Sequence, residues 1–198
     1  MELFKGTDYV YPFQQNNPDT FFPLIKITND RNESIYEECL RVFGYSKATS
    51  NYVNRVSDAF VELADNIYFH SGAKVNSGWG YIHAQAHPQS GIIRLGICDV
   101  GVGIYGSYER TGQRKGRTEE NLVRDVFEEM ESSLNVGPGK GHRGLGLHEV
   151  REFINTNTGL LTMRTGNMLV YVNQTGVYPQ RTTYKTEGTW IELRIPIR

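Results

Sequence analysis

The sequence predicts a domain of the α+β class, which combines amphipathic helices with β-strands. Apolar residues recur at three- and four-residue steps over residues 33–43 and 52–71, and this spacing predicts two helices. Two short apolar runs, residues 80–86 and 92–98, flank a turn-like segment and predict a β-hairpin. The C-terminal part repeats the strand pattern. The chain has 198 residues, a length that suits one folded domain with its own core.

We expect that domain at residues 51–198, preceded by an N-terminal extension at residues 1–50. The first 30 residues are rich in aromatic residues and proline, and they carry no pattern that indicates chemistry. Residues 24–28 predict a short edge strand. The extension is expected to cap the core or to contact a partner.

The two predicted helices have recognisable ends. Gly44 ends the first helix, and Ser50 or Asn51 caps the second. The buried face of the second helix is expected to carry Val53, Val56, Phe60, Leu63 and Ile67.

A polar stripe lies beside this apolar face. Glu62, Asn66 and His70 are four residues apart, so they fall on one side of the helix. A carboxylate, an amide and an imidazole in one stripe are unusual beside so apolar a face, and they mark a candidate functional surface. A solvated helix face is the alternative and the commoner origin of such residues. For His70 alone, a structural role is favoured.

The most informative stretch is residues 97–104. The predicted strand 92–98 ends on Asp99, which is followed by Gly101 and Gly103. A carboxylate at a strand end can hold a flat polar ligand by its hydrogen-bonding edge, while glycines let the backbone approach without interference from a Cβ atom. The alternative is a strand followed by an ordinary turn, which Asp99 stabilises through its own backbone.

Residues 105–143 are strongly polar and are expected to form a mobile lid that closes on a ligand. Within them, residues 119–133 predict a helix, and residues 135–141 are rich in glycine. An ordinary surface loop is the alternative, but loops of this length are uncommon without a function. The apolar face of the predicted helix is Leu122, Val126, Phe127 and Met130.

A glycine-rich segment opens the next predicted helix, residues 141–157. Such an entry presents free N–H groups to an anion, and the helix dipole adds to the attraction. The segment is not a Walker loop, because no Gly-Lys-Ser/Thr follows it. Beyond it, residues 160–164 and 168–172 predict a hairpin around residues 165–167, and residues 189–195 predict the last strand.

Composition argues against several classes of protein. Basic and acidic residues number 21 and 22, a formal net charge of -1, and this balance does not demand nucleic acid or an acidic membrane as a partner. No apolar run is long enough to span a bilayer, and the N-terminus lacks the pattern of a signal peptide. Cys39 and Cys98 lie in apolar contexts and do not suggest a disulfide, so a cytoplasmic protein is expected. A metal site at His83 and His87 is disfavoured, because no cysteine or third histidine joins them.

Four short blocks occur in a fixed order along the chain. They are Glu62-Leu63-Ala64-Asp65-Asn66 on a helix, Asp99-Val100-Gly101-Val102-Gly103-Ile104 after a strand, Gly144-Leu145-Gly146-Leu147 before a helix, and Gly188-Thr189 opening a strand. Together, over about residues 52–197, they resemble the GHKL superfamily, which includes DNA gyrase B, the heat-shock chaperone ATPase, histidine kinases and MutL. The detail is most similar to stand-alone bacterial ATP-binding proteins related to histidine kinases and anti-sigma-factor kinases.

The resemblance implies a fold and a ligand. The fold is a Bergerat-type two-layer α/β sandwich, with helices on one face of a mixed, mostly antiparallel sheet. ATP with magnesium lies between the helices and the lid. Asp99 would accept a hydrogen bond from the exocyclic amine of adenine, and Thr189 would join it through water. Gly101, Gly103 and Ile104 would let the backbone approach the nucleotide.

The resemblance also assigns the phosphate end of the site. Asn66 would hold magnesium (Mg2+) against the phosphate oxygens. Glu62 matches the position that hydrolysing members use as a general base, and a carboxylate there can deprotonate water or a hydroxyl group. The N–H groups that bind the phosphates would come from Gly144, Leu145, Gly146 and Leu147.

Two departures from the family pattern limit the assignment. Ile67 follows Asn66 where the family usually has alanine, and no histidine-bearing helix pair precedes the domain, which argues against a complete sensor histidine kinase. Three functions stay open: a magnesium-dependent ATPase or ATP-driven switch, a kinase that phosphorylates serine or histidine on a separate partner protein, and a nucleotide-gated interaction module with little turnover. Glu62 favours the first two. The sequence does not separate a water nucleophile from a partner side chain, nor does it fix the oligomeric state, a homodimer included.

Overall fold

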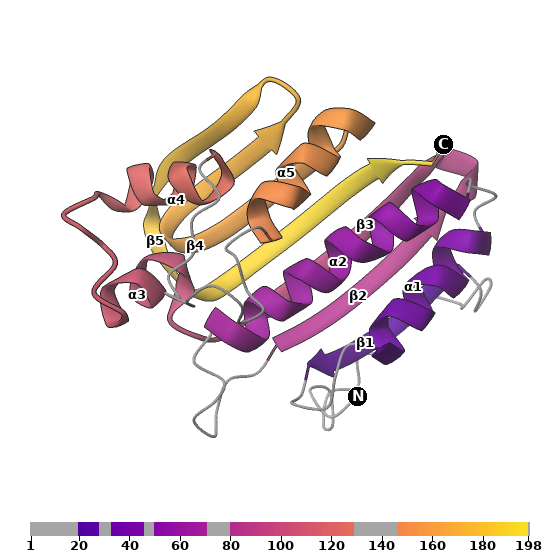
Figure 1. Ribbon diagram of the computed structural model, residues 1–198, viewed down its shortest axis with the longest axis horizontal. Helices are drawn as coiled ribbons and strands as arrows, with labels where there is room; N and C mark the ends of the chain where they lie inside the picture. Colours follow the sequence, from indigo (N-terminus) through magenta and orange to yellow (C-terminus); the bar gives the residue numbers. More distant parts are fainter. Residues whose placement is uncertain (1–19, 28–32, 46–49, 71–79, 129–145, 198) are drawn as a thin grey trace, which may run out of the picture.

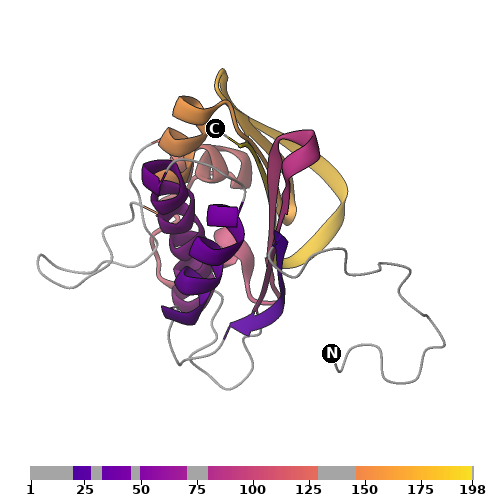
Figure 2. The ribbon, with the colours of Figure 1, turned by 90° about the vertical axis from the view of Figure 1, so that its right-hand side faces the viewer.

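The computed structural model describes residues 20–27, 33–45, 50–70, 80–128 and 146–197. These residues form two layers, a β-sheet and a set of helices that covers one face of it (Figure 1). Figure 2 shows the layers edge-on, with the helices on one side of the sheet only. The predicted α+β class with helices on one face is therefore confirmed.

The sheet has five strands in the order β1-β2-β3-β5-β4, and each neighbouring pair is antiparallel. Alternate side chains of the central strands face the helices, as the period of two requires. The strands are β1 (Phe21–Ile27), β2 (Gly80–His87), β3 (Ile92–Asp99), β4 (Leu160–Asn173) and β5 (Gly176–Pro196).

The helix layer packs its apolar faces on the sheet. Leu63 and Phe60 of α2 and Ile154 of α5 are fully or almost fully buried and share one core with the inward residues of the strands. None of the described helices is long and apolar enough to cross a membrane. The helices are α1 (Glu33–Tyr45), α2 (Ser50–His70), α3 (Gly103–Arg110), α4 (Glu119–Glu128) and α5 (Gly146–Asn157).

The described part of the N-terminal extension belongs to the same two layers. β1 pairs with β2 at the edge of the sheet, and α1 packs beside α2. Cys39, Val42 and Phe43 of α1 are fully buried in the common core. Residues 20–27 and 33–45 are thus built into the domain, while residues 1–19 and 28–32 lie outside the described residues.

The C-terminal hairpin is longer than predicted, and its turn lies elsewhere. β4 runs without a break from Leu160 to Asn173, so the prediction of a turn at residues 165–167 is wrong. The reversal comes at Gln174 and Thr175, where Thr175 donates from both its N–H and its hydroxyl to the side chain of Asn173. Gly166 has a φ of 54° and lies opposite a bulge in β5. The register shifts on both sides of Gly166: Thr165 pairs with Thr189 but Gly166 pairs with Thr186, so the extra residues belong to β5.

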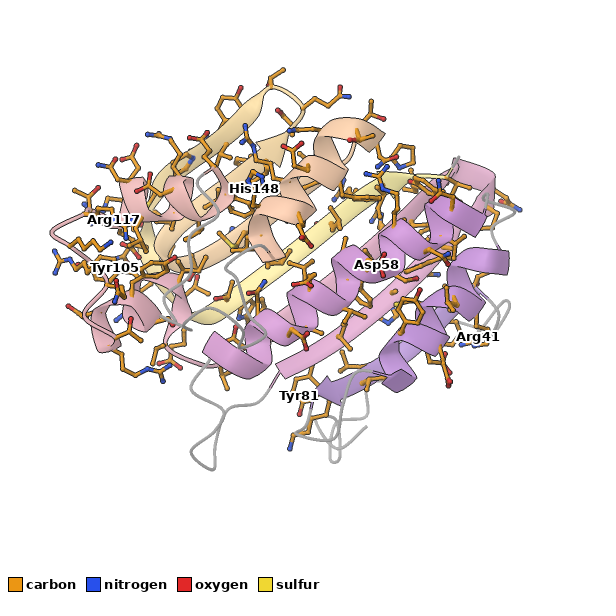
Figure 3. The ribbon with its side chains drawn as sticks, in the orientation of Figure 1. Arg41, Asp58, Tyr81, Tyr105, Arg117 and His148 are labelled. Atoms are coloured by element: carbon orange, nitrogen blue, oxygen red, sulfur yellow. The ribbon has the colours of Figure 1, made fainter. Side chains whose placement is uncertain are left out.

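The first part of the predicted lid is built into the fold. Residues 103–110 form α3 and residues 119–128 form α4, which buries Leu122, Val123, Val126 and Phe127 against the core. Between the helices, Arg117 pairs with Asp125 at 3.2 Å and lies over the ring of Tyr108 (Figure 3). Within residues 105–128, two helices joined by a short turn segment, residues 111–118, thus pack on the core instead of forming one long loop. The rest of the predicted lid, residues 129–143, lies outside the described residues.

Candidate functional site

Asp99 ends β3 as a buried carboxylate held at both of its oxygens. Its side chain is 4% exposed. Oδ1 accepts a hydrogen bond from the N–H of Gly101 at 2.7 Å, and Oδ2 accepts one from the N–H of Thr189 at 3.1 Å. The first bond closes the turn after β3, and the second ties it to the neighbouring strand β5. The side chain of Thr189 also hydrogen-bonds this carboxylate. A carboxylate offers about four acceptor positions, so it can still accept from a further donor.

Burial changes the ionisation of this group. The pKa of Asp99 is raised from its ordinary value to about 6, because burial penalises the charged form more than the hydrogen bonds from Gly101 and Thr189 favour it. At neutral pH the group is thus a carboxylate that lacks full solvation. A ligand that donates a hydrogen bond to it would offset part of that cost.

Two glycines with positive φ let the backbone close around Asp99. A Cβ atom on Gly188, whose φ is 68°, would lie 2.0 Å from the carbonyl oxygen of Asp99 and 2.7 Å from its Oδ1. A Cβ atom on Gly103, whose φ is also 68°, would lie 2.7 Å from Oγ1 of Thr165 and 3.0 Å from the carbonyl oxygen of Gly188. Larger residues cannot occupy either position without displacing the backbone.

Thr165 closes this end of the site. Its side chain is 1% exposed, and its hydroxyl oxygen accepts a hydrogen bond from the N–H of Ile104 at 3.0 Å. The start of α3 is therefore fixed to β4, opposite the bond that fixes Asp99 to β5. We call this set of residues the Asp99 cluster: Asp99, Gly101, Gly103, Ile104, Thr165, Gly188 and Thr189.

A second cluster forms where α2 meets the N-terminus of α5. A Cβ atom on Gly146 would lie 2.7 Å from Nδ2 of Asn66 and 3.1 Å from Oε2 of Glu62. Glu62 and Asn66, two members of the polar stripe that the sequence predicts on α2, therefore face the start of α5. The side chain of His70, the third member of that stripe, lies outside the described residues. We call Glu62, Asn66 and Gly146 the α2–α5 cluster.

Asn66 carries an unusual polar atom in this cluster. Among the residues that the structure describes, its buried Nδ2 has no hydrogen-bond partner. Leaving a buried amide unpaired costs on the order of 1–3 kcal/mol, so such a group is expected to have a partner in the working protein. A carboxamide can also turn to present its oxygen instead of its nitrogen.

Glu62 lies in an acidic environment. Its pKa is raised, first by partial burial and then by the negative charges of Glu149, Asp65 and Asp58. A carboxylate with a raised pKa is a better proton acceptor than one at its ordinary value. The excess of negative charge also favours a divalent cation nearby.

The structure brings most of the sequence-predicted site residues into these two clusters. Asp99, Gly101, Gly103, Ile104 and Thr189 meet at the end of β3, and Glu62, Asn66 and Gly146 meet between α2 and α5. Leu147 follows Gly146 in the first turn of α5. Gly144 and Leu145 lie outside the described residues.

Two residues of the Asp99 cluster were not predicted as site residues. Thr165 lies within a segment that was predicted as a turn. Gly188 belongs to the Gly188-Thr189 block, in which only Thr189 was given a role in the site. A Thr-Gly pair and an isolated Gly-Thr pair are too common to identify a site without the pairing of β4 with β5.

The two clusters lie at the same end of the molecule. α2 contacts both α3 and α5, so the C-terminal half of α2 connects the end of β3 with the start of α5 (Figure 1). No model of a known protein family matches this chain, and no curated protein matches its sequence.

Proposed function

We propose that the chain binds ATP with magnesium, the adenine at the Asp99 cluster and the phosphates at the α2–α5 cluster, and transfers the terminal phosphoryl group. The observation that carries this proposal is Asp99, a buried carboxylate fixed by two backbone N–H groups and surrounded by glycines. Its remaining acceptor capacity suits a flat ligand that presents an amine. Adenine presents an amine at C6. Guanine carries a carbonyl oxygen at that position, which a carboxylate would repel, so guanine could bind only in a different orientation, through its N1–H and 2-amino edge.

The α2–α5 cluster suits the other end of the nucleotide. The first N–H groups of α5 have no partner within the helix, and together with the helix dipole they attract phosphate oxygens. The close approach of Gly146 to α2 brings these N–H groups beside Asn66. The first N–H groups of α5, which suit an anion, would thus lie beside the unpaired side-chain amide of Asn66.

The residues present fit magnesium bound jointly with a nucleotide. Within the described segments, no three acidic, histidine or cysteine side chains gather into a metal site. Asn66 would therefore hold the ion together with phosphate oxygens, which magnesium prefers. When bound, the ion would neutralise charge on the phosphates. The unpaired Nδ2 of Asn66 is a donor and suits a phosphate oxygen, while the acidic surroundings of Glu62 suit the cation.

Glu62 would act as the base in phosphoryl transfer. It would take the proton of an attacking oxygen, which forms a bond to the terminal phosphorus while the bond to the bridging oxygen breaks and ADP leaves. The attacking oxygen belongs to water in an ATPase and to a serine hydroxyl in a partner-directed kinase. Incubation with terminally labelled ATP and magnesium separates these two, because one releases free phosphate and the other labels a protein.

Calorimetry tests the binding proposal. Wild-type protein should bind ATP with magnesium and should prefer ATP to GTP. Asp99→Asn should weaken binding by about thirtyfold or more, because an amide cannot accept at both oxygens and places its own N–H against one of the backbone donors. Thermal unfolding must show that this variant is folded.

Glu152→Gln provides a matched control. This residue is an exposed carboxylate on α5, so its replacement removes the same charge away from the site. It should bind ATP like the wild type. Unchanged ATP affinity in folded Asp99→Asn would refute the adenine assignment.

A further inference from the structure

We propose that Glu119, the first residue of α4, is a positioning residue that holds the Asp99 cluster in its nucleotide-binding shape; this inference rests on the proposed function. Glu119 is 48 positions away in sequence from Asn167, the residue that it contacts. Its Oε1 accepts a hydrogen bond from the N–H of Asn167 at 3.0 Å, directly after Gly166, which lies opposite the bulge in β5.

The contact between Glu119 and Gly166 is unusually close. A Cβ atom on Gly166 would lie 1.9 Å from Oε1 of Glu119, so only glycine allows the carboxylate to reach the backbone here. The φ of 54° at Gly166 points to the same requirement. The irregular pairing at Gly166 and the position of the Glu119 carboxylate are therefore linked, because Oε1 lies where the Cβ atom of a larger residue would be.

Two routes lead from Gly166 to Asp99. Along β4, the preceding residue is Thr165, whose hydroxyl oxygen accepts from Ile104 at the start of α3. Across to β5, Thr165 pairs with Thr189 and Gly166 pairs with Thr186, so the residues between them leave the regular ladder. Gly188, which packs against Asp99, belongs to that irregular segment.

α4 is held in place at both of its ends, so the backbone of Glu119 has a fixed position. The hydroxyl oxygen of Thr118 accepts from the N–H of Asn121 at 3.2 Å and caps the helix. At the other end, Nδ1 of His148 lies 3.1 Å from the carbonyl oxygen of Phe127. A carbonyl can only accept, so Nδ1 carries the proton. α4 thus joins Gly166 and Asn167 of β4 to the first turn of α5.

Glu119 does not belong to either cluster, and its effect is expected through Asn167 and Gly166. Glu119→Ala should lower ATP affinity about tenfold, because one hydrogen bond and the shape of the bulge are lost. Glu119→Gln keeps an acceptor oxygen of the same size and should restore most of that affinity. Glu120→Ala is the control, since the neighbouring Glu120 is exposed and pairs with Arg124 on the same helix.

The readout must separate positioning from general stability. Calorimetry should compare ATP with GTP and with inorganic triphosphate, each with magnesium. Glu119→Ala should reduce the preference for ATP over GTP and leave triphosphate affinity unchanged, because only the adenine end is disturbed. Loss of stability alone would not change the ATP-to-GTP ratio of the folded protein.

The outcomes are distinguishable. If wild-type protein fails to bind ATP, the proposed function fails. If wild-type protein binds ATP and Glu119→Ala retains both the affinity and the preference for ATP, the positioning role is refuted while the proposed function stands. Equal losses for ATP and triphosphate would also refute it, because they would place the effect outside the adenine end.

Discussion

The ionisation of Asp99 links the site to pH. Its pKa of about 6 in the folded chain lies above the ordinary value of 3.8, so the unfolded chain gives up this proton at lower pH than the folded chain does. Asp99 therefore lowers the stability of the free protein as pH rises from about 4 to about 6, and its cost is constant above that range. A nucleotide amine needs the ionised form, so ATP binding should depend on pH in the opposite direction.

We expect ATP affinity to fall by about tenfold between pH 7 and pH 5, as the carboxylate takes up its proton. Calorimetry at half-unit steps of pH would measure this. In Asp99→Asn the residual affinity should show no such step near pH 6. A wild-type affinity that is flat between pH 5 and pH 7 would contradict the role given to the carboxylate.

Glu62 and Asn66 should separate turnover from binding. Glu62→Ala removes the base but no phosphate contact, so turnover should fall about a hundredfold or more while ATP affinity holds or rises slightly. Asn66→Ala should lose magnesium-dependent affinity as well as turnover. Release of phosphate, or labelling of a partner, measures the first effect, and calorimetry with and without magnesium measures the second. If Glu62→Ala turned over ATP as fast as the wild type, Glu62 would not be the base.

At the scale of single residues, the sequence could predict only those site residues that stand in a recognisable local pattern. Asp99 and Gly103 stand out because a carboxylate and spaced glycines follow an apolar strand. Thr165 and Glu119 do not, because their roles arise from contacts between segments far apart in the chain. Neither residue type is unusual on its own.

At the scale of elements, α4 differs most from expectation. A lid that opens would need weakly packed residues, but α4 buries four apolar side chains and is tied at both ends. The sequence did predict a helix from residue 119, since its apolar spacing is helical. It did not reveal that this helix is part of the core, because the polar residues around it dominate the segment.

Hydrogen exchange distinguishes a fixed α4 from a lid. The amides of residues 122–127 should be strongly protected without nucleotide, since they are hydrogen-bonded within α4, which buries Leu122, Val123, Val126 and Phe127 against the core. Added ATP and magnesium should change their protection little. Fast exchange without nucleotide that becomes slow with ATP would contradict this and restore the lid to its full predicted length.

The strands show a similar division between local and distant causes. β2 and β3 were predicted within one residue of their observed ends, because their apolar runs stop at clear turn residues. β4 was split in two, because Thr165-Gly166-Asn167 has the composition of a turn. The carboxylate of Glu119 stabilises an irregular pairing with β5 there instead, and a contact between elements thereby overrides a local signal.

At the scale of the whole molecule, one core joins the N-terminal elements to the rest. A boundary at residue 50 would cut between α1 and α2, yet α1 buries Phe43 completely among residues of that core. The sequence suggested an extension because residues 1–30 carry no functional pattern. The segment that carries the site residues can be shorter than the segment that folds as one unit. In this chain the sheet begins with β1, which precedes the first site residue, Glu62.

Phe43→Ala tests whether α1 and the site fold as one unit. Removal of a fully buried aromatic side chain should reduce the free energy of unfolding by about 3–5 kcal/mol, because a cavity remains in the core. Tyr184→Ala, at a position that is 78% exposed, should change it by less than about 0.5 kcal/mol. Urea unfolding followed by circular dichroism and by nucleotide binding should give one shared midpoint, shifted equally for both signals. If Phe43→Ala instead produced an early transition that left ATP binding intact, α1 would be a separate cap, and the single core inferred from its packing would be wrong.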